Sequence, residues 1–232
     1  MPLTAILQAR MSSRRLPGKM LAPVAGRPLL AWLIERLSAC TTLDGIILAT
    51  SDHPSDTPLA ELAEKLGIRC YRGPLDDVAM RFIQAIDVFG LPSFVRICGD
   101  SPLIDPALVD YAVRLFEAGP CDITTNVHPR SFPKGQSVEV VNSAAFKAAY
   151  AAMTENEERE HVTSWFYNHT AEVAITNFTA RRDMSSIRLC VDTAEDLASI
   201  RALAARMTSD QSRYSLDDLL ALHAETEKPG AW

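Results

Sequence analysis

Residues 8–19 read Gln-Ala-Arg-Met-Ser-Ser-Arg-Arg-Leu-Pro-Gly-Lys and separate an apolar run, residues 3–7, from an apolar, helix-like stretch, residues 28–37. Because backbone N–H groups in a strand–loop–helix segment can face a phosphate, this order favours an anion-binding loop. No Asp or Glu precedes Glu35, so nothing nearby in the sequence neutralises the cations of the loop. Those cations are Arg10, Arg14, Arg15 and Lys19. The segment is therefore predicted to hold a polyphosphate.

Two other interpretations of this basic loop are a solvated or nucleic-acid-binding face and a transit peptide. A transit peptide is amphipathic, whereas this segment carries strand, turn and Pro-Gly signals. A general nucleic-acid binder is usually basic overall, whereas this chain has a formal net charge of -6. The charges also follow the first predicted strand, where α/β folds bind their ligands. We therefore expect a small anionic ligand and no nucleic acid.

Length and composition are those of an ordinary globular protein. The 232 residues are 47% hydrophobic and 22% charged, which suffices for a single domain with its own core. No apolar run approaches the roughly 20 residues of a membrane span, and no signal peptide is visible, so no membrane partner is expected. The five cysteines are scattered without a Cys-x-x-Cys pair, which is typical of reduced thiols in a cytoplasmic protein.

The first half of the chain alternates between strand-like and helix-like segments. Strands are predicted at residues 4–7, 45–49, 68–71 and 94–98, and helices at 28–39, 57–66, 77–89 and 106–118. Asp105 is expected to cap the last of these helices, with Pro106 at its first position. Because strands separated by helices form βαβ units, the predicted fold class is α/β, with a three-layer, Rossmann-like, mostly parallel sheet.

The regular alternation of strand-like and helix-like segments ends at about residue 120. We predict a long loop at 126–135, strands at 137–141, 172–178 and 187–191, and helices at 143–153, 156–169, 194–207 and 216–224. Ser215 is expected to cap the last helix, and the tail at 227–232 is expected to fray. Residues 1–232 thus form a single domain in which 126–178 are an inserted segment, suited to a lid, a dimer contact or acceptor binding.

Two aspartates stand at the ends of predicted strands. Asp100 follows the apolar run 94–98, and a carboxylate at the carboxyl end of a parallel strand faces the ligand crevice. Asp192 likewise ends an apolar run and opens a helix. Each has a purely structural alternative, a turn at Ser101-Pro102 for Asp100 and a helix cap completed by Glu195 for Asp192. Together with the cationic loop, however, two such carboxylates predict a Mg²⁺ site that faces a triphosphate.

Seven segments, 6–19, 47–52, 72–81, 95–106, 133–140, 158–163 and 188–196, occur in the order and spacing of one known family. Within the first, residues 9–19 match Ala-Arg-x-x-Ser-x-Arg-Leu-Pro-Gly-Lys, a highly specific motif. The chain resembles cytidylyltransferase-like proteins of the spore-coat polysaccharide biosynthesis type, which are similar to CMP-KDO and acylneuraminate cytidylyltransferases. The likeness covers nearly the whole chain and implies a fold of the nucleotide-diphospho-sugar transferase type.

The resemblance also implies roles for individual residues. It places nucleotide binding at Ala9, Arg10, Ser13, Arg15, Lys19, Gly99 and Asp100. Among these, it implies catalytic roles for Arg15, Lys19 and Asp100. It implies metal ligands at Asp100 and Asp192. Acceptor-binding residues are implied at Lys134, Glu139 and His161, and a partly buried structural role is the alternative for His161.

The function implied by the resemblance is transfer of CMP from CTP to a sugar or sugar acid, with release of pyrophosphate, in surface polysaccharide or glycoconjugate biosynthesis. Mg²⁺ is the implied cofactor and a homodimer the implied assembly. One alternative is a glycosyltransferase of the nucleotide-sugar-binding α/β type, but the Asp-x-Asp metal motif expected of it is absent from this sequence. The other is a non-catalytic nucleotide-binding relative, against which both aspartates and the loop lysine argue.

Overall fold

Seven strands form the central sheet of the computed structural model, which describes residues 3–227. Their order across the sheet is β5-β4-β1-β6-β8-β7-β9. The strands are β1 (Leu3–Gln8), β4 (Leu43–Ser51), β5 (Arg69–Gly73), β6 (Ser93–Cys98), β7 (Ile123–Thr125), β8 (Glu139–Asn142) and β9 (Ile175–Asn177). A separate two-stranded hairpin consists of β2 (Pro23–Val24) and β3 (Arg27–Pro28).

The predicted parallel sheet is confirmed. β1 pairs in parallel with β4 on one side and β6 on the other, and β4 pairs in parallel with β5. β8 runs antiparallel to both β6 and β7, so the sheet is mixed only at this point of its described part. Of the four strands on the parallel side, β1, β4 and β6 carry mostly buried apolar residues because helices cover them on both faces, whereas the edge strand β5 is mostly half-buried.

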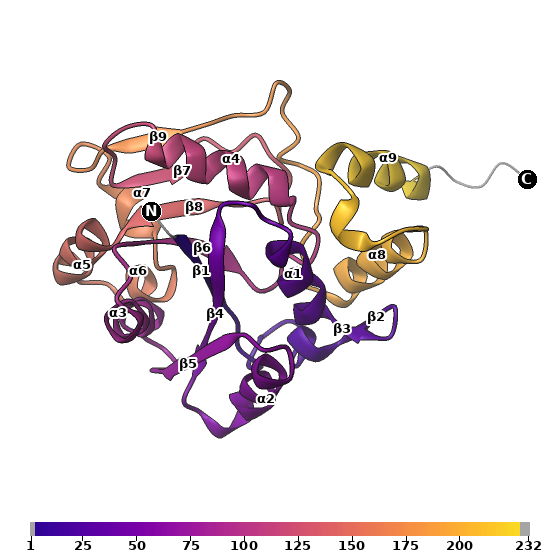
Figure 1. Cartoon of the computed structure of the whole chain (residues 1–232), viewed down its shortest axis with the longest axis horizontal. Helices are drawn as coiled ribbons and strands as arrows, with labels where there is room; N and C mark the ends of the chain where they lie inside the picture. Colours follow the sequence, from indigo (N-terminus) through magenta and orange to yellow (C-terminus); the bar gives the residue numbers. More distant parts are fainter. Residues whose placement is uncertain (1–2, 228–232) are drawn as a thin grey trace, which may run out of the picture.

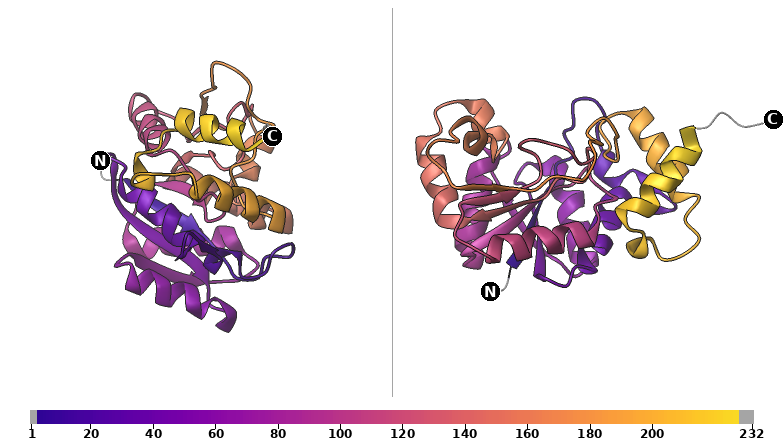
Figure 2. Two further views of the ribbon diagram at one scale, coloured as in Figure 1. Left: turned by 90° about the vertical axis from the view of Figure 1, so that its right-hand side faces the viewer. Right: turned by 90° about the horizontal axis from the view of Figure 1, so that it is seen from above.

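Helices cover both faces of the sheet, as Figure 1 shows. They are α1 (Leu29–Ser38), α2 (Thr57–Lys65), α3 (Val78–Phe89), α4 (Pro106–Glu117), α5 (Ser143–Ala152), α6 (Asn156–Glu160), α7 (Ser164–Asn168), α8 (Ala194–Ala204) and α9 (Leu216–Glu227). Three 3-10 helices, η1 (Lys19–Leu21), η2 (Pro54–Asp56) and η3 (Gln211–Arg213), lie in the connections. Figure 2 places α5–α7 and α8–α9 at opposite ends of the molecule.

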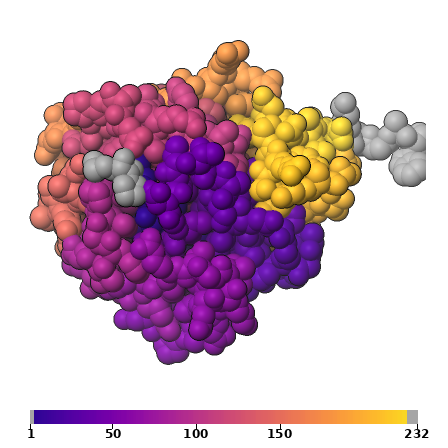
Figure 3. Space-filling view, viewed as in Figure 1, coloured from indigo at the N-terminus to yellow at the C-terminus, as the bar shows by residue number. Residues whose placement is uncertain are grey.

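Alternate side chains along the strands pack into two separate hydrophobic cores. In β1, Ala5 and Leu7 pack with α1, α2, α4, α8 and α9, whereas Ile6 packs with α3, α5 and α7. On the second face the rings of Phe82, Phe94 and Phe146 contact one another. Figure 3 shows α8 and α9, in yellow, against the indigo N-terminal part, which extends the first core. Strand alternation thus fixes which residues at the strand ends face each helical layer.

Helix starts follow the polar residues that the sequence marks. The Asp105 carboxylate accepts a hydrogen bond from the N–H of Ala107 (2.9 Å), and Pro106 opens α4 as predicted. Ser215 and Asp218 likewise bond to each other's backbone at the start of α9. Each cap satisfies an N–H group that the first helical turn leaves unpaired.

Two predicted elements are wrong. The helix predicted at 156–169 breaks into α6 and α7 because Val162 adopts a left-handed φ of 49° and the Thr163 hydroxyl donates to buried Glu139 (2.7 Å). No strand forms at 187–191, where the described chain makes one isolated bridge, Lys134 to Arg188, across the end of the sheet. The β2–β3 hairpin and β7 were not predicted, because strands of two or three residues carry no periodicity.

The segment 126–178 does not stand apart from the sheet. Its strand β8 lies between β6 and β7, while α5, α6 and α7 pack beside α3. Within residues 3–227, no helix combines the length and apolar character that crossing a bilayer requires. The tail predicted to fray lies outside the described residues from 228 onward.

Candidate nucleotide site

The loop after β1 folds back on itself. The carbonyl oxygen of Met11 accepts hydrogen bonds from the N–H groups of Ser13 and Gly18, both at 2.9 Å. Gly18 closes the loop with a left-handed φ of 76°, a conformation that costs a glycine little. η1 starts directly afterwards, so Lys19 enters the interior at the point where the loop ends.

A buried carboxylate that the sequence did not single out anchors this loop. Asp56 accepts hydrogen bonds from the N–H of Met11 (2.8 Å) and from Ser51 and Thr50 at the end of β4. Burial alone would raise the pKa of Asp56, but the bonds from Ser51 and Met11 outweigh it and lower the pKa. The ionised carboxylate therefore joins the basic loop to the neighbouring strand β4.

Lys19 lies between the two predicted metal ligands. Its side chain is 7% exposed, and its Nζ donates to Asp100 Oδ2 (3.2 Å) and Asp192 Oδ1 (3.2 Å). The carbonyl oxygen of Val191, at 2.6 Å, is the third acceptor. A buried ammonium requires such charged and polar partners. Residues far apart in the sequence thus meet around one cation.

Asp192 is free for this contact because it does not cap α8. Thr193 is the N-cap instead, and Asp196 completes the capping box, so the predicted cap of Asp192 and Glu195 is wrong by one residue. Arg15 contacts Asp192 Oδ1 at 3.0 Å. Burial alone would raise the pKa of Asp192, but Lys19 and Arg15 beside it lower the pKa.

Backbone contacts hold the two aspartate segments together. The N–H of Val191 donates to the carbonyl oxygen of Asp100 at 2.8 Å. Nearby, Gly135 has a φ of 98° and packs so closely on Leu189 that an added Cβ would lie 2.5 Å from the Leu189 backbone. The relative position of Asp100 and Asp192 therefore depends on main-chain geometry.

A cavity of about 410 Å³ opens beside these residues, at the carboxyl ends of β1 and β6. Of the predicted site residues, its lining includes Ala9, Arg10, Ser13, Arg15, Lys19, Gly99, Asp100, His161 and Asp192. The further lining residues are Gln8, Arg14, Met20, Cys98 and Glu160. Four basic side chains at the end of a parallel sheet suit a phosphorylated ligand.

Two predicted acceptor residues lie elsewhere. Lys134 is exposed, in the bridge to Arg188, and is not in the lining. Glu139 is 3% exposed and forms an ion pair with Arg96, and neither residue is in the lining. Burial alone would raise the pKa of Glu139, but Arg96 and the Tyr167 hydroxyl lower the pKa, so the pair is ionic. His161 is the predicted acceptor residue that reaches the cavity.

Glu160 and Gln8 are cavity residues that the sequence reasoning did not identify. Glu160 Oε1 pairs with Arg10 Nη2 at 2.7 Å, and the bond from Arg10 lowers the pKa of Glu160. Gln8 is the last residue of β1, and its carboxamide oxygen accepts from Arg96 Nη2 at 3.1 Å. The position of Gln8 directly before the basic loop was the one available signal.

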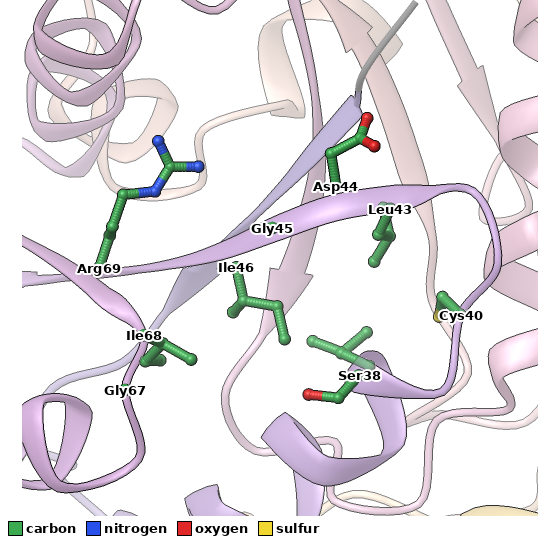
Figure 4. A pocket seen from close by; sticks show the side chains of 10 residues that line it. Ser38, Cys40, Leu43, Asp44, Gly45, Ile46, Gly67, Ile68 and Arg69 are labelled. Atoms are coloured by element: carbon green, nitrogen blue, oxygen red, sulfur yellow. The ribbon is translucent and has the colours of Figure 1, made fainter.

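A second cavity, of about 480 Å³, lies at the start of β4, away from this site. Figure 4 shows Ile46 and Ile68 on one side of the strands, with Asp44 and Arg69 pointing away from them. Its remaining lining comes mainly from small or aliphatic residues between α1 and β5. Because its charged lining residues are one acid, Asp44, and one base, Arg69, this cavity offers no cluster of cations for a phosphate.

The donor set at Asp100 and Asp192 fits a hard divalent cation that the ligand helps to bind. Among the described residues, no three His, Cys, Asp or Glu side chains come together as a complete metal site. Mg²⁺ characteristically takes one or two protein carboxylates and completes its coordination with phosphate oxygens and water. Two carboxylates beside a cationic loop match that requirement.

The fold and the cavity together define an α/β nucleotide-binding protein built to handle phosphates at the end of β1 and β6. A family model described as cytidylyltransferase matches residues 4–221. The chain belongs to the cytidylyltransferase family. Members of this family generally use a divalent metal ion, in agreement with the donor set.

Individual relatives are similar over most of their length. The spore coat polysaccharide biosynthesis protein SpsF of Bacillus subtilis is 33% identical over 225 residues, covering 94% of this chain and 92% of its own. A 3-deoxy-manno-octulosonate cytidylyltransferase of Bdellovibrio bacteriovorus is 32% identical over 156 residues, covering 65% and 62%. The solved structure of a cytidylyltransferase from Leptospira borgpetersenii is 28% identical with a TM-score of 0.92, covering 97% and 95%.

Proposed function

We propose that this protein transfers CMP from CTP to a sugar acid and releases pyrophosphate, in the synthesis of a surface polysaccharide or glycoconjugate. The observation that carries the proposal is the meeting of Lys19, Asp100 and Asp192 beside the basic loop in one cavity. The sugar acid is inferred from the octulosonate cytidylyltransferases, and the polysaccharide from the SpsF relative.

In the proposed reaction, an acceptor oxygen attacks the α-phosphorus of CTP in line with the departing pyrophosphate. Arg15 and Lys19 bind the β- and γ-phosphates, and Arg10 lies near the α-phosphate. Of the backbone N–H groups of residues 12–18, those of Ser13, Leu16 and Gly18 bond within the loop and Pro17 has none. The N–H groups of Ser12, Arg14 and Arg15 therefore add stabilisation for developing negative charge. Asp100 and Asp192 would hold Mg²⁺, which neutralises phosphate charge and aligns the leaving group.

The acceptor enters beside α6 in this proposal. His161 lines the cavity there and contacts the sugar acid, while Lys134 and Glu139 support that side of the site from outside the lining. The segment 126–178 acts as the acceptor lid and the contact between two copies in a homodimer. Scattered cysteines that are free of disulfide bonds agree with a cytoplasmic enzyme that uses CTP.

Pyrophosphate release tests the proposal directly. The full-length chain is incubated with CTP, Mg²⁺ and a panel of sugar acids, and wild type is compared with Asp100→Asn, Asp192→Asn and the exposed control Asp44→Asn. Loss of a charged group at the reacting phosphates should lower the rate on the order of 10²–10³-fold, and the control should match wild type. Absence of pyrophosphate with every sugar acid would overturn the proposal, and hydrolysis of a nucleotide sugar instead would indicate a glycosyltransferase.

A further inference from the structure

The cavity lining contains both charged and neutral residues. Its charged residues are Arg10, Arg14, Arg15, Lys19, Asp100, Glu160 and Asp192. Its neutral residues at the ends of β1 and β6 are Gln8, Ala9, Cys98 and Gly99. A nucleoside triphosphate likewise has a charged phosphate tail and a neutral base.

Gln8 places one polar group among these neutral residues, directly opposite Cys98 in the sheet register. Its Oε1 accepts a hydrogen bond from Arg96 Nη2 at 3.1 Å. A guanidinium has only N–H donors, so it must face the carboxamide oxygen and not the NH₂ group. The hydrogen bond from Arg96 therefore determines the orientation of the Gln8 amide.

A contact with Glu139 also holds Arg96 in place. Arg96 pairs with Glu139 across β6 and β8, and it lies outside the cavity lining while Gln8 lies within it. Glu139 is held in turn by the hydroxyl of Thr163 (2.7 Å) and by Tyr167. Because turning the Gln8 amide would set two donors face to face beside the Arg96–Glu139 ion pair, the oxygen stays on Arg96 and the NH₂ group is left for another partner at this lining position. Within residues 3–227 that NH₂ group has no hydrogen-bond partner.

We propose that the Gln8 carboxamide determines base specificity by donating a hydrogen bond to N3 of the pyrimidine base. This inference rests on the proposed nucleotidyl transfer and names the group that selects its nucleotide. Cytosine presents acceptors at O2 and N3, whereas N3 of uracil carries a hydrogen and would face the Gln8 donor with another donor. A site with a fixed donor rejects such a base, because both polar groups would be left unpaired.

The substitution Gln8→Glu isolates this role. A carboxylate keeps the length of the side chain and the contact to Arg96, but it replaces the NH₂ donor with an acceptor. We expect wild type to bind CTP at least about tenfold more tightly than UTP in calorimetric titrations with Mg²⁺. In Gln8→Glu, CTP binding should weaken about tenfold and UTP binding should strengthen, so that the preference inverts. Gln8→Met, which has neither donor nor acceptor, should weaken CTP alone and abolish the preference.

The outcomes separate this inference from the proposed reaction. If folded Gln8→Glu and Gln8→Met retain the wild-type ratio of CTP to UTP affinity within twofold, Gln8 does not read the base. If the variants change the ratio but wild type releases no pyrophosphate, the inference on recognition stands and the proposed transfer fails. A wild-type chain that binds neither nucleotide would overturn both.

Discussion

Replacing Lys19 by Met removes the cation between the two aspartates while keeping the apolar stem of the side chain. In the wild type the ammonium donates three hydrogen bonds, to Asp100, Asp192 and the carbonyl of Val191. Without it, two carboxylates that lie within 3.2 Å of the same Nζ face each other with less compensation. The variant should therefore be less stable in the absence of ligand.

The size of this loss follows from the burial of the partners. Hydrogen bonds to charged groups contribute about 1.5–3 kcal/mol each when buried. Here the Asp100 and Asp192 side chains are 27% and 22% exposed, and Arg15 still contacts Asp192. Screening and this remaining cation reduce the total, so we expect a loss of about 2 kcal/mol. For a chain of this size that lowers Tm by about 4–8 °C.

The assay is thermal unfolding of the nucleotide-free protein with and without Mg²⁺. Mg²⁺ should raise the Tm of Lys19→Met by several degrees and that of wild type much less, because Lys19 otherwise neutralises the carboxylates. Lys147→Met, which breaks the exposed pair with Asp87, is the matched control and should cost less than about 1 kcal/mol. Equal melting of Lys19→Met and wild type, with equal responses to Mg²⁺, would refute the reasoning.

Three further substitutions test other parts of the site. Asp56→Asn should lower the free energy of unfolding by about 1.5–3 kcal/mol at pH 7. Because the pKa of Asp56 in the folded protein lies below its ordinary 3.8, the difference in stability between wild type and variant should shrink as acid protonates the carboxylate. A stability difference that does not change with pH would contradict this reasoning. Glu160→Gln should tighten CTP binding about threefold by releasing Arg10 from its ion pair, and unchanged affinity in calorimetry would argue against that competition. Gly135→Ala should lower the free energy of unfolding by about 2–4 kcal/mol, since the added Cβ would overlap the Leu189 backbone. A variant that denatures at the same denaturant concentration as wild type would show that the backbone moves to accommodate the Cβ.

Elements with strong local signals were predictable from the sequence. The apolar runs that became β1, β4 and β6 lie between the two cores, and Asp105 with Pro106 marked the start of α4. The basic loop and the two aspartates could be found because each follows an apolar run. The structure brings them into one cavity, as expected for strand ends that meet at one edge of a sheet.

The remaining features depend on contacts that no local pattern carries. The break at Val162 follows from the bond between Thr163 and Glu139, residues 24 apart in the chain. The cap of α8 shifted by one residue because Asp192 contacts Lys19, 173 residues away. The amide orientation of Gln8 likewise depends on Arg96 in another strand. Tertiary contacts therefore decided what the local sequence left open.

The contact from Lys19 to the carbonyl of Val191 joins residues 172 positions apart. During synthesis from the N-terminus, the basic loop leaves the ribosome long before the segment that holds Asp192 exists. The first 120 residues can form β1, β4, β5 and β6, but Lys19 gains its second carboxylate only after residue 192 has been made. A chain that ends before residue 192 therefore has the basic loop and Asp100 but lacks two of the three acceptors of Lys19.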